Sequence, residues 1–131
     1  MLPGETYTLS AAIQAPEGAR PGFDGWGREA VGETAANLGT VLEDEVHRAT
    51  TTGPITVISS SAVELDEGWV RTAVTFRFEG ERPLTWYVGV VPDRSSKTGI
   101  TSSFAELQLV GSYVLLPYRP GPAARGATDL R

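Results

Sequence analysis

The sequence predicts an all-β domain, an antiparallel β-sandwich, and three observations support this prediction. From Trp69 to Phe78 the side chains alternate between apolar and polar types, which is typical of a strand with one buried face. From Ile55 to Leu65 the chain is rich in β-branched residues, which favour strands. No stretch repeats apolar residues at helical spacing, and the expected strands follow one another at the intervals of a sandwich.

Four more segments are expected to form regular elements, and turn-forming residues bound them. These segments are 6–13, 40–49, 84–91 and 102–110. Three of them predict strands, whereas 40–49 is ambiguous between a strand and a short helix. Only residues 79–83 separate the strand that ends at Phe78 from the segment 84–91, so these two strands are expected to form a hairpin.

Two stretches are not expected to be strands. Residues 15–39 contain six glycines and two prolines without a sustained period, which predicts a long glycine-rich loop. Residues 119–131 are polar and have few side chains to bury, which predicts an extended C-terminal arm. The expected organisation is one β-sandwich domain over 1–118, followed by this arm. The predicted core includes Tyr7, Leu9, Val70, Val74, Phe76, Trp86 and Val88.

Composition excludes several classes of function. The 131 residues suit a single domain, and the absence of cysteine excludes disulfides, a thiol nucleophile and thiolate metal sites. The formal net charge of −5 argues against binding along a phosphate backbone, so no nucleic-acid partner is expected. No apolar run is long enough to span a membrane and the N-terminus lacks a signal peptide, so we expect synthesis in the cytoplasm of the producing cell and no membrane partner.

A catalytic role is not expected either. His47 is the only histidine, and no serine lies in the sequence context of a nucleophile elbow, so a catalytic triad and a histidine-based metal site have no support. Sixteen acidic residues make chance carboxylate pairs inevitable, so such pairs do not by themselves predict a glycosidase. We therefore expect a non-enzymatic protein without a cofactor.

Three blocks of the sequence resemble a known family. The blocks are PGETYTLSA at 3–11, EGWVRTAVTFRF at 67–78 and FAELQLVGSYVLLPY at 104–118. Together they resemble the jelly-roll carbohydrate-binding modules of families four and nine, especially the copies found in bacteriophage tail and other virion proteins. The resemblance implies a jelly-roll, galactose-binding-like sandwich. In that family an aspartate of the closing strand often helps to bind a structural calcium, but Ala105 and Glu106 occupy this region here, so we expect no metal.

Two functions are compatible with this resemblance. The first is a structural or interaction protein of a bacteriophage particle, a capsid decoration or tail component, located in the virion. Its partners would be other virion subunits, either capsid or tail proteins or further copies of the chain in a homo-oligomer. The scarcity of outward aromatic residues, the missing export signal and the segment 119–131 favour this prediction. The alternative is a true carbohydrate-binding module that recognises cell-surface or polysaccharide glycans.

Sugar binding needs an exposed aromatic platform beside planar hydrogen-bonding groups. Tyr87 has the outward phase of its strand, and across the expected hairpin it would share an outer face with Arg71. Trp26 stands among glycines in FDGWG, where it has little core to enter unless the loop folds back or a partner covers it. The candidate ligand-binding residues are therefore Trp26, Arg71 and Tyr87, although exposed Tyr and Arg side chains on neighbouring strands are also ordinary sheet surface.

Overall fold

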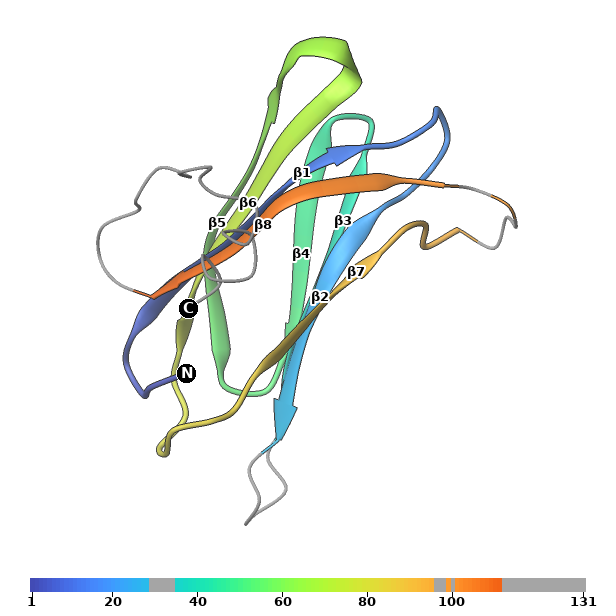
Figure 1. The fold of residues 1–131 in the computed structure, drawn as a ribbon. Helices are drawn as coiled ribbons and strands as arrows, with labels where there is room; N and C mark the ends of the chain where they lie inside the picture. The colour runs from blue at the N-terminus through green and yellow to red at the C-terminus, as the bar shows by residue number, and fades with distance from the viewer. Residues whose placement is uncertain (29–34, 96–98, 100, 112–131) are drawn as a thin grey trace, which may run out of the picture.

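The computed structural model describes residues 1–28, 35–95, 99 and 101–111 (Figure 1). Within these ranges the chain forms eight strands and one short 3₁₀ turn, η1 (Asp66–Gly68). The strands are β1 (Thr6–Gln14), β2 (Gly22–Arg28), β3 (Ala35–Glu43), β4 (Val46–Thr52), β5 (Ile55–Glu64), β6 (Trp69–Phe78), β7 (Tyr87–Val91) and β8 (Ser103–Gly111). The predicted arm over 119–131 and the end of the predicted domain, 112–118, lie outside the described residues.

The strands form two antiparallel four-stranded sheets (Figure 1). One sheet has the order β5-β6-β1-β8, and the other has the order β4-β3-β2-β7. The chain passes from one sheet to the other at Gly53 and Pro54, between β4 and β5, so these edge strands lie together at one side of the molecule. The predicted all-β class, with two antiparallel sheets compatible with a sandwich, is confirmed.

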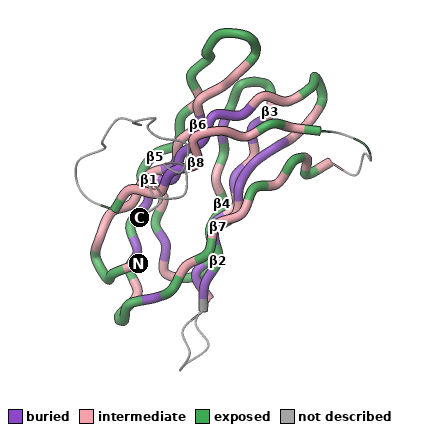
Figure 2. Tube along the Cα trace, in the orientation of Figure 1, coloured by how far each residue is buried: buried purple, intermediate pink, exposed green. Residues whose placement is uncertain are grey.

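The core lies between the two sheets, and the strand alternation explains its composition. Figure 2 shows the buried residues concentrated along the facing strands. Of the predicted core residues, Leu9, Val74 and Phe76 are buried. The remaining four predicted core residues, Tyr7, Val70, Trp86 and Val88, are half-buried and pack against the core. The alternation in β1 and β6 therefore identified the buried face correctly.

The predicted glycine-rich loop over 15–39 is wrong over two stretches, because residues 22–28 form β2 and β3 begins at Ala35. The glycines of β2 are needed for packing rather than for turning. A Cβ atom added at Gly25 would lie 2.0 Å from Cη2 of Trp86, and one added at Gly27 would lie 2.9 Å from Cδ1 of the same ring. The small residues of β2 thus make room for the indole of Trp86 in the core.

The predicted hairpin between the strand ending at Phe78 and the following strand is also wrong. β6 pairs with β1 and β5, whereas β7 pairs with β2 in the opposite sheet. The intervening residues cross between the sheets because Leu84 is buried and Trp86 packs against the core, which pins the crossing segment. The backbone N–H of Leu84 also donates to the carbonyl oxygen of Met1, with an N···O distance of 2.9 Å.

The ambiguous segment 40–49 forms strands rather than a helix. β3 and β4 form a hairpin whose turn residues, Asp44 and Glu45, both have positive φ angles, of 51° and 64°. Two consecutive positive φ values match the twist of antiparallel strands, as in a type I′ turn. Within the part of the chain that the structure describes, no helix is long and apolar enough to cross a membrane.

Candidate functional site

The outer face of the β4-β3-β2-β7 sheet presents an aromatic and polar row that crosses all four strands. On β2 the buried residues Phe23, Gly25 and Gly27 alternate with outward residues, so Trp26 points away from the core. Trp26 lies opposite Tyr87 of β7 and Asn37 of β3 in the strand register. The complete row consists of Thr52, Asn37, Trp26 and Tyr87. We call this the Trp26 row.

The rings of Trp26 and Tyr87 form a solvent-exposed stack. Their centroids lie 6.2 Å apart with an interplanar angle of 28°. Trp26 is 46% exposed and Tyr87 is 57% exposed. A Cβ atom added at Gly89 would lie 3.2 Å from Cη2 of Trp26, so the indole lies close over this glycine. The pair offers a wide apolar surface supported by the sheet beneath it.

A second outward-facing row lies two residues along the strands and contains two polar residues and two glycines. It consists of Thr50, Gly39, Asp24 and Gly89. Gly39 has no side chain, and a Cβ atom placed there would meet Oδ1 of Asp24 at 3.3 Å and Oγ1 of Thr50 at 3.8 Å. The surface is therefore hollowed beside the Trp26 row, with hydroxyl and carboxylate groups at the edges of the hollow.

Arg94 reaches this face from the segment after β7 and is held by three acceptors. Its Nε donates to the carbonyl oxygen of Thr40 at 2.7 Å, and its Nη2 donates to the carbonyl oxygen of Phe23 at 3.2 Å. Nη2 also forms an ion pair with Oδ1 of Asp24 at 2.5 Å. The guanidinium and the Asp24 carboxylate thus fix each other beside the Trp26 row, which preorganises two polar groups.

Two hollows flank the ridge that Trp26 and Asn37 form on this face. The first, which we call the Asp24 hollow, is lined by Asp24, Gly25, Trp26, Asn37, Leu38, Gly39, Thr50 and Thr52. The second, the Tyr87 hollow, is lined by Trp26, Gly27, Ala35, Asn37, Thr85 and Tyr87. Both hollows share Trp26 and Asn37, so one indole borders two adjacent depressions.

The structure brings together two of the three candidate residues from the sequence. Trp26 and Tyr87 are stacked, but Arg71 lies on β6 in the other sheet. The expected common face of Arg71 and Tyr87 is wrong, because it depended on a hairpin that does not form. Arg71 instead forms an ion pair with Glu106 of β8. Because Trp26 and Tyr87 lie on the other sheet, their placement gives no support to a ligand-binding role for Arg71.

Sequence reasoning missed three polar residues of this face: Asp24, Asn37 and Arg94. Asn37 stands between the apolar residues Ala36 and Leu38, an alternation that would have placed it outward once the strand was recognised. Asp24 could have been found in the same way, since it precedes Trp26 by two residues. Arg94 lies beyond the end of β7, where strand periodicity gives no information.

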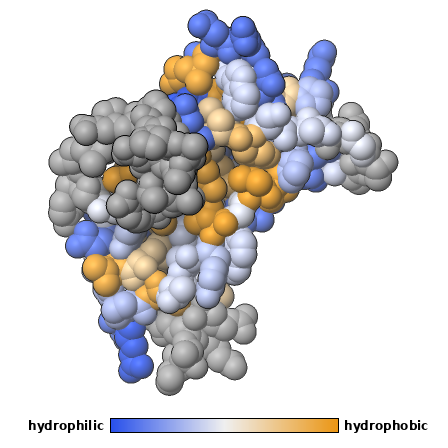
Figure 3. All heavy atoms as spheres, in the orientation of Figure 1, coloured by the Kyte–Doolittle hydropathy of each residue, from blue (hydrophilic) through white to orange (hydrophobic). Residues whose placement is uncertain are grey.

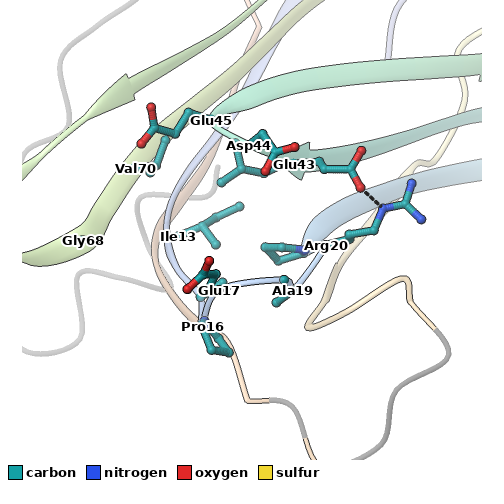
Figure 4. Close-up of a pocket in the computed structure, with 14 residues that line it drawn as sticks. Ile13, Pro16, Glu17, Ala19, Arg20, Glu43, Asp44, Glu45, Gly68 and Val70 are labelled. Carbon is teal, nitrogen blue, oxygen red and sulfur yellow. Dashed lines mark ion pairs between the residues drawn. The ribbon is translucent and has the colours of Figure 1, made fainter.

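A separate cleft lies at one end of the sandwich, between the β1–β2 connection and the turns between β3 and β4 and between β5 and β6 (Figure 4). Glu17, Asp44 and Glu45 lie at this cleft, and Arg20 Nε lies 2.7 Å from Oε2 of Glu43. A hydrogen bond and charge repulsion from Glu64 raise the pKa of Glu45. The cleft has no aromatic side chain among its described lining residues.

The acidic residues and His47 can also be examined as possible metal ligands or catalytic groups. Among the described residues, no three His, Cys, Asp or Glu side chains are grouped so that they could hold a metal ion. His47 points into the core, where its Nδ1 lies 3.3 Å from the carbonyl oxygen of Ala73 and its ring lies 5.2 Å from that of Phe23. Burial lowers the pKa of His47, which favours the neutral form of this inward-facing ring.

The fold and this face define a class of protein: an antiparallel two-sheet β protein with an exposed aromatic stack beside fixed polar groups. Comparison with known proteins identifies no relative of this chain. No protein-family model matches the chain, and neither a curated protein nor a solved structure matches it.

Proposed function

We propose that this protein is a non-catalytic glycan-binding module and that the outer face of the β4-β3-β2-β7 sheet is its binding site. The observation that supports this most directly is the exposed stack of Trp26 and Tyr87 beside the fixed pair of Asp24 and Arg94. Aromatic rings bind the apolar C–H face of a pyranose, while planar polar groups bind its hydroxyls.

The arrangement of this face suits weak, reversible binding. Trp26 and Tyr87 are supported by the sheet, and Arg94 is held by backbone carbonyls, so little side-chain entropy is lost when a ligand binds. Asn37 and Thr50 add an amide and a hydroxyl that can exchange hydrogen bonds with sugar hydroxyls. Weak binding of this kind becomes effective when several copies act together.

A glycan array with multivalent presentation of the protein tests this function. We expect at least one bound glycan, and we expect Trp26→Ala and Tyr87→Ala each to lower its affinity by about tenfold, the effect of losing roughly 1.4 kcal/mol. Arg71→Ala is the matched control, because this half-buried ion-pair residue lies on the opposite sheet and should leave binding unchanged. If no glycan binds, or if both aromatic variants bind as well as the parent protein, the proposal is wrong.

A structural role in a bacteriophage particle is a second candidate, and one observation favours it. β7 and β8 are edge strands at the side of the molecule away from the β4–β5 connection, and each pairs with only one strand among those described. Figure 3 shows apolar residues gathered on the face where these two strands lie. The half-buried apolar residues on these two strands and just before β7 include Trp86, Val88, Phe104, Leu107 and Leu109.

Edge strands with neighbouring apolar surface favour association with another chain, which is what a virion subunit needs. A jelly-roll, galactose-binding-like connectivity belongs to the same proposal. Light scattering behind size-exclusion chromatography tests it: a defined homo-oligomer that Val90→Lys dissociates would support assembly through this side, because Val90 is an exposed apolar residue of β7. A monomer at high concentration that also fails to bind isolated virion proteins would rule the structural role out.

A further inference from the structure

We propose that the ligand of this face is an uncharged oligosaccharide of at least two sugar units, with one unit on each side of Trp26. This inference rests on the proposed glycan-binding function and specifies its ligand. It follows from two features: the pair of hollows that share Trp26 and Asn37, and the neutralised charge of Asp24 and Arg94.

The two hollows together span more of the face than one sugar unit can cover. Along β3 the lining of the Asp24 hollow ends at Gly39, which pairs with Asp24, and the lining of the Tyr87 hollow ends at Ala35, which pairs with Arg28. These two pairings are four residues apart, which corresponds to a combined span of roughly 13 Å at the usual rise of a strand. A single pyranose ring is shorter than this span, so one sugar unit cannot fill both hollows.

A ridge lies between the two hollows. Trp26 and Asn37 border both depressions, so a ligand that crosses from one to the other passes over the indole. The indole offers an apolar surface to the ligand, and the amide of Asn37 can bond hydroxyls or linking oxygens on either side. The ridge therefore joins the two hollows into one continuous site rather than separating two independent ones.

The two hollows differ in chemistry. The Asp24 hollow carries the polar side chains of Asp24, Thr50 and Thr52, whereas the Tyr87 hollow has the ring of Tyr87 and the small residues Gly27 and Ala35. A sugar unit in the first would be bound mainly through its hydroxyls. A unit in the second would be bound mainly by contact with an aromatic face. The second unit should thus add affinity that depends on Tyr87.

The charged side chains near the Asp24 hollow favour a ligand without charge. Arg94 already donates to the carbonyl oxygens of Thr40 and Phe23 and is paired with Asp24, so its charge is compensated. Arg48, a further described cation on the outer face of β4, has Nη1 3.9 Å from Oε1 of Glu43. The described lining of the Asp24 hollow contains the Asp24 carboxylate and no cation, so a ligand carboxylate there would meet a charge of the same sign. Uncharged sugar units fit this hollow better than uronates do.

Calorimetric titration of the full chain tests both parts of the inference. The probes are gluco-, manno-, galacto- and xylo-oligosaccharides of one to four units, with oligogalacturonates of the same lengths. We expect at least one neutral series to gain about tenfold in affinity between one and three units, and the galacturonates to bind at least about tenfold more weakly. A monosaccharide that binds as tightly as the trisaccharide, or galacturonates that bind equally well, would overturn the inference.

Variants separate the two hollows. Tyr87→Ala should remove most of the gain with chain length and leave monosaccharide affinity within about twofold. Thr50→Val, which keeps the shape of the side chain but removes its hydroxyl, should weaken every length. Asp24→Asn should improve the binding of galacturonates relative to neutral chains, because it removes the carboxylate that pairs with Arg94. Unchanged ratios in Asp24→Asn would show that charge at this position does not select the ligand.

The outcomes distinguish this inference from the function on which it rests. If a glycan array shows binding that depends on Trp26 but no probe series shows a gain with length, glycan binding stands and the two-hollow inference falls. If neither the array nor the titrations show binding, both fall. Circular dichroism of each variant confirms that lost binding does not reflect lost fold.

Discussion

The substitution Gly25→Ala tests why β2 can lie over Trp86. Gly25 is buried in β2, and an added Cβ would lie 2.0 Å from Cη2 and 2.1 Å from Cζ2 of the Trp86 ring. The ring cannot move freely, because its Nε1 donates to the carbonyl oxygen of Ala36 at 2.8 Å and its centroid lies 5.2 Å from that of Phe76. The methyl group therefore forces either the strand or the ring to shift.

The expected cost of this substitution follows from three terms. Overpacking a core usually costs about 1–3 kcal/mol. Displacing Trp86 would lose a hydrogen bond worth about 1 kcal/mol. The lower entropy of alanine in the unfolded chain offsets about 0.4–1 kcal/mol. We therefore expect Gly25→Ala to lower the free energy of unfolding by about 1–3 kcal/mol, measured by urea denaturation with an unchanged m-value.

A double-mutant cycle identifies the cause. Trp86→Leu shortens the side chain that the new methyl group would contact, so Gly25→Ala should cost about 1 kcal/mol less in that background. Gly39→Ala is the matched control, because the atom nearest to its new Cβ, Oδ1 of Asp24, would lie 3.3 Å away, compared with 2.0 Å for the nearest atom at Gly25. Gly39→Ala should remain stable yet weaken glycan binding by filling the Asp24 hollow. A Gly25→Ala protein as stable as the parent would refute this account of β2.

Three further predictions concern the core and its chemistry. Phe76→Ala should cost about 3–5 kcal/mol in chemical denaturation, since Phe76 is fully buried, and a loss below about 1 kcal/mol would mean that the faces of β6 are misassigned. Burial lowers the pKa of His47 below its unfolded value of about 6.5, so the stability of the fold should fall as the pH drops below that value. The variant His47→Gln should remove this dependence. A thermal unfolding midpoint of the parent protein that stays constant between about pH 7.5 and 5 would contradict the prediction. Excess EDTA and millimolar calcium should give the same thermal midpoint, and a rise of several degrees with calcium would reveal a specific site.

Strand alternation predicted the sheets well where one face is buried and side chains are large. β6 and β1 show this: Val74 and Phe76 are buried as expected, and so is Leu9. Tyr87 likewise has the outward orientation that its phase predicted, with 57% of its surface exposed. In such strands the apolar or polar character of each residue indicates whether it is buried or exposed, so the local sequence is sufficient to predict the buried face.

The sequence could not predict β2 or the pairing of its residues with β7. Glycines at 25 and 27 remove the alternation signal, although these positions are buried, because the volume they leave is filled by Trp86 from a segment far along the chain. The stacking of Trp26 on Tyr87 also depends on a register between strands about 60 residues apart in sequence. Neither fact can be read from residues near either side chain.

The same glycines connect the core to the candidate site. Trp86 fills the inner side of β2 because Gly25 and Gly27 have no side chains, while Trp26 occupies the outer side of the same strand and lies over Gly89. A bulky residue at position 25 would move the strand that fixes Trp26 against Tyr87, so a purely internal change should disturb the outer face. The position of the aromatic stack is thus set by packing on the opposite side of the sheet, which is why stability and glycan binding should decline together in Gly25→Ala but separately in Gly39→Ala.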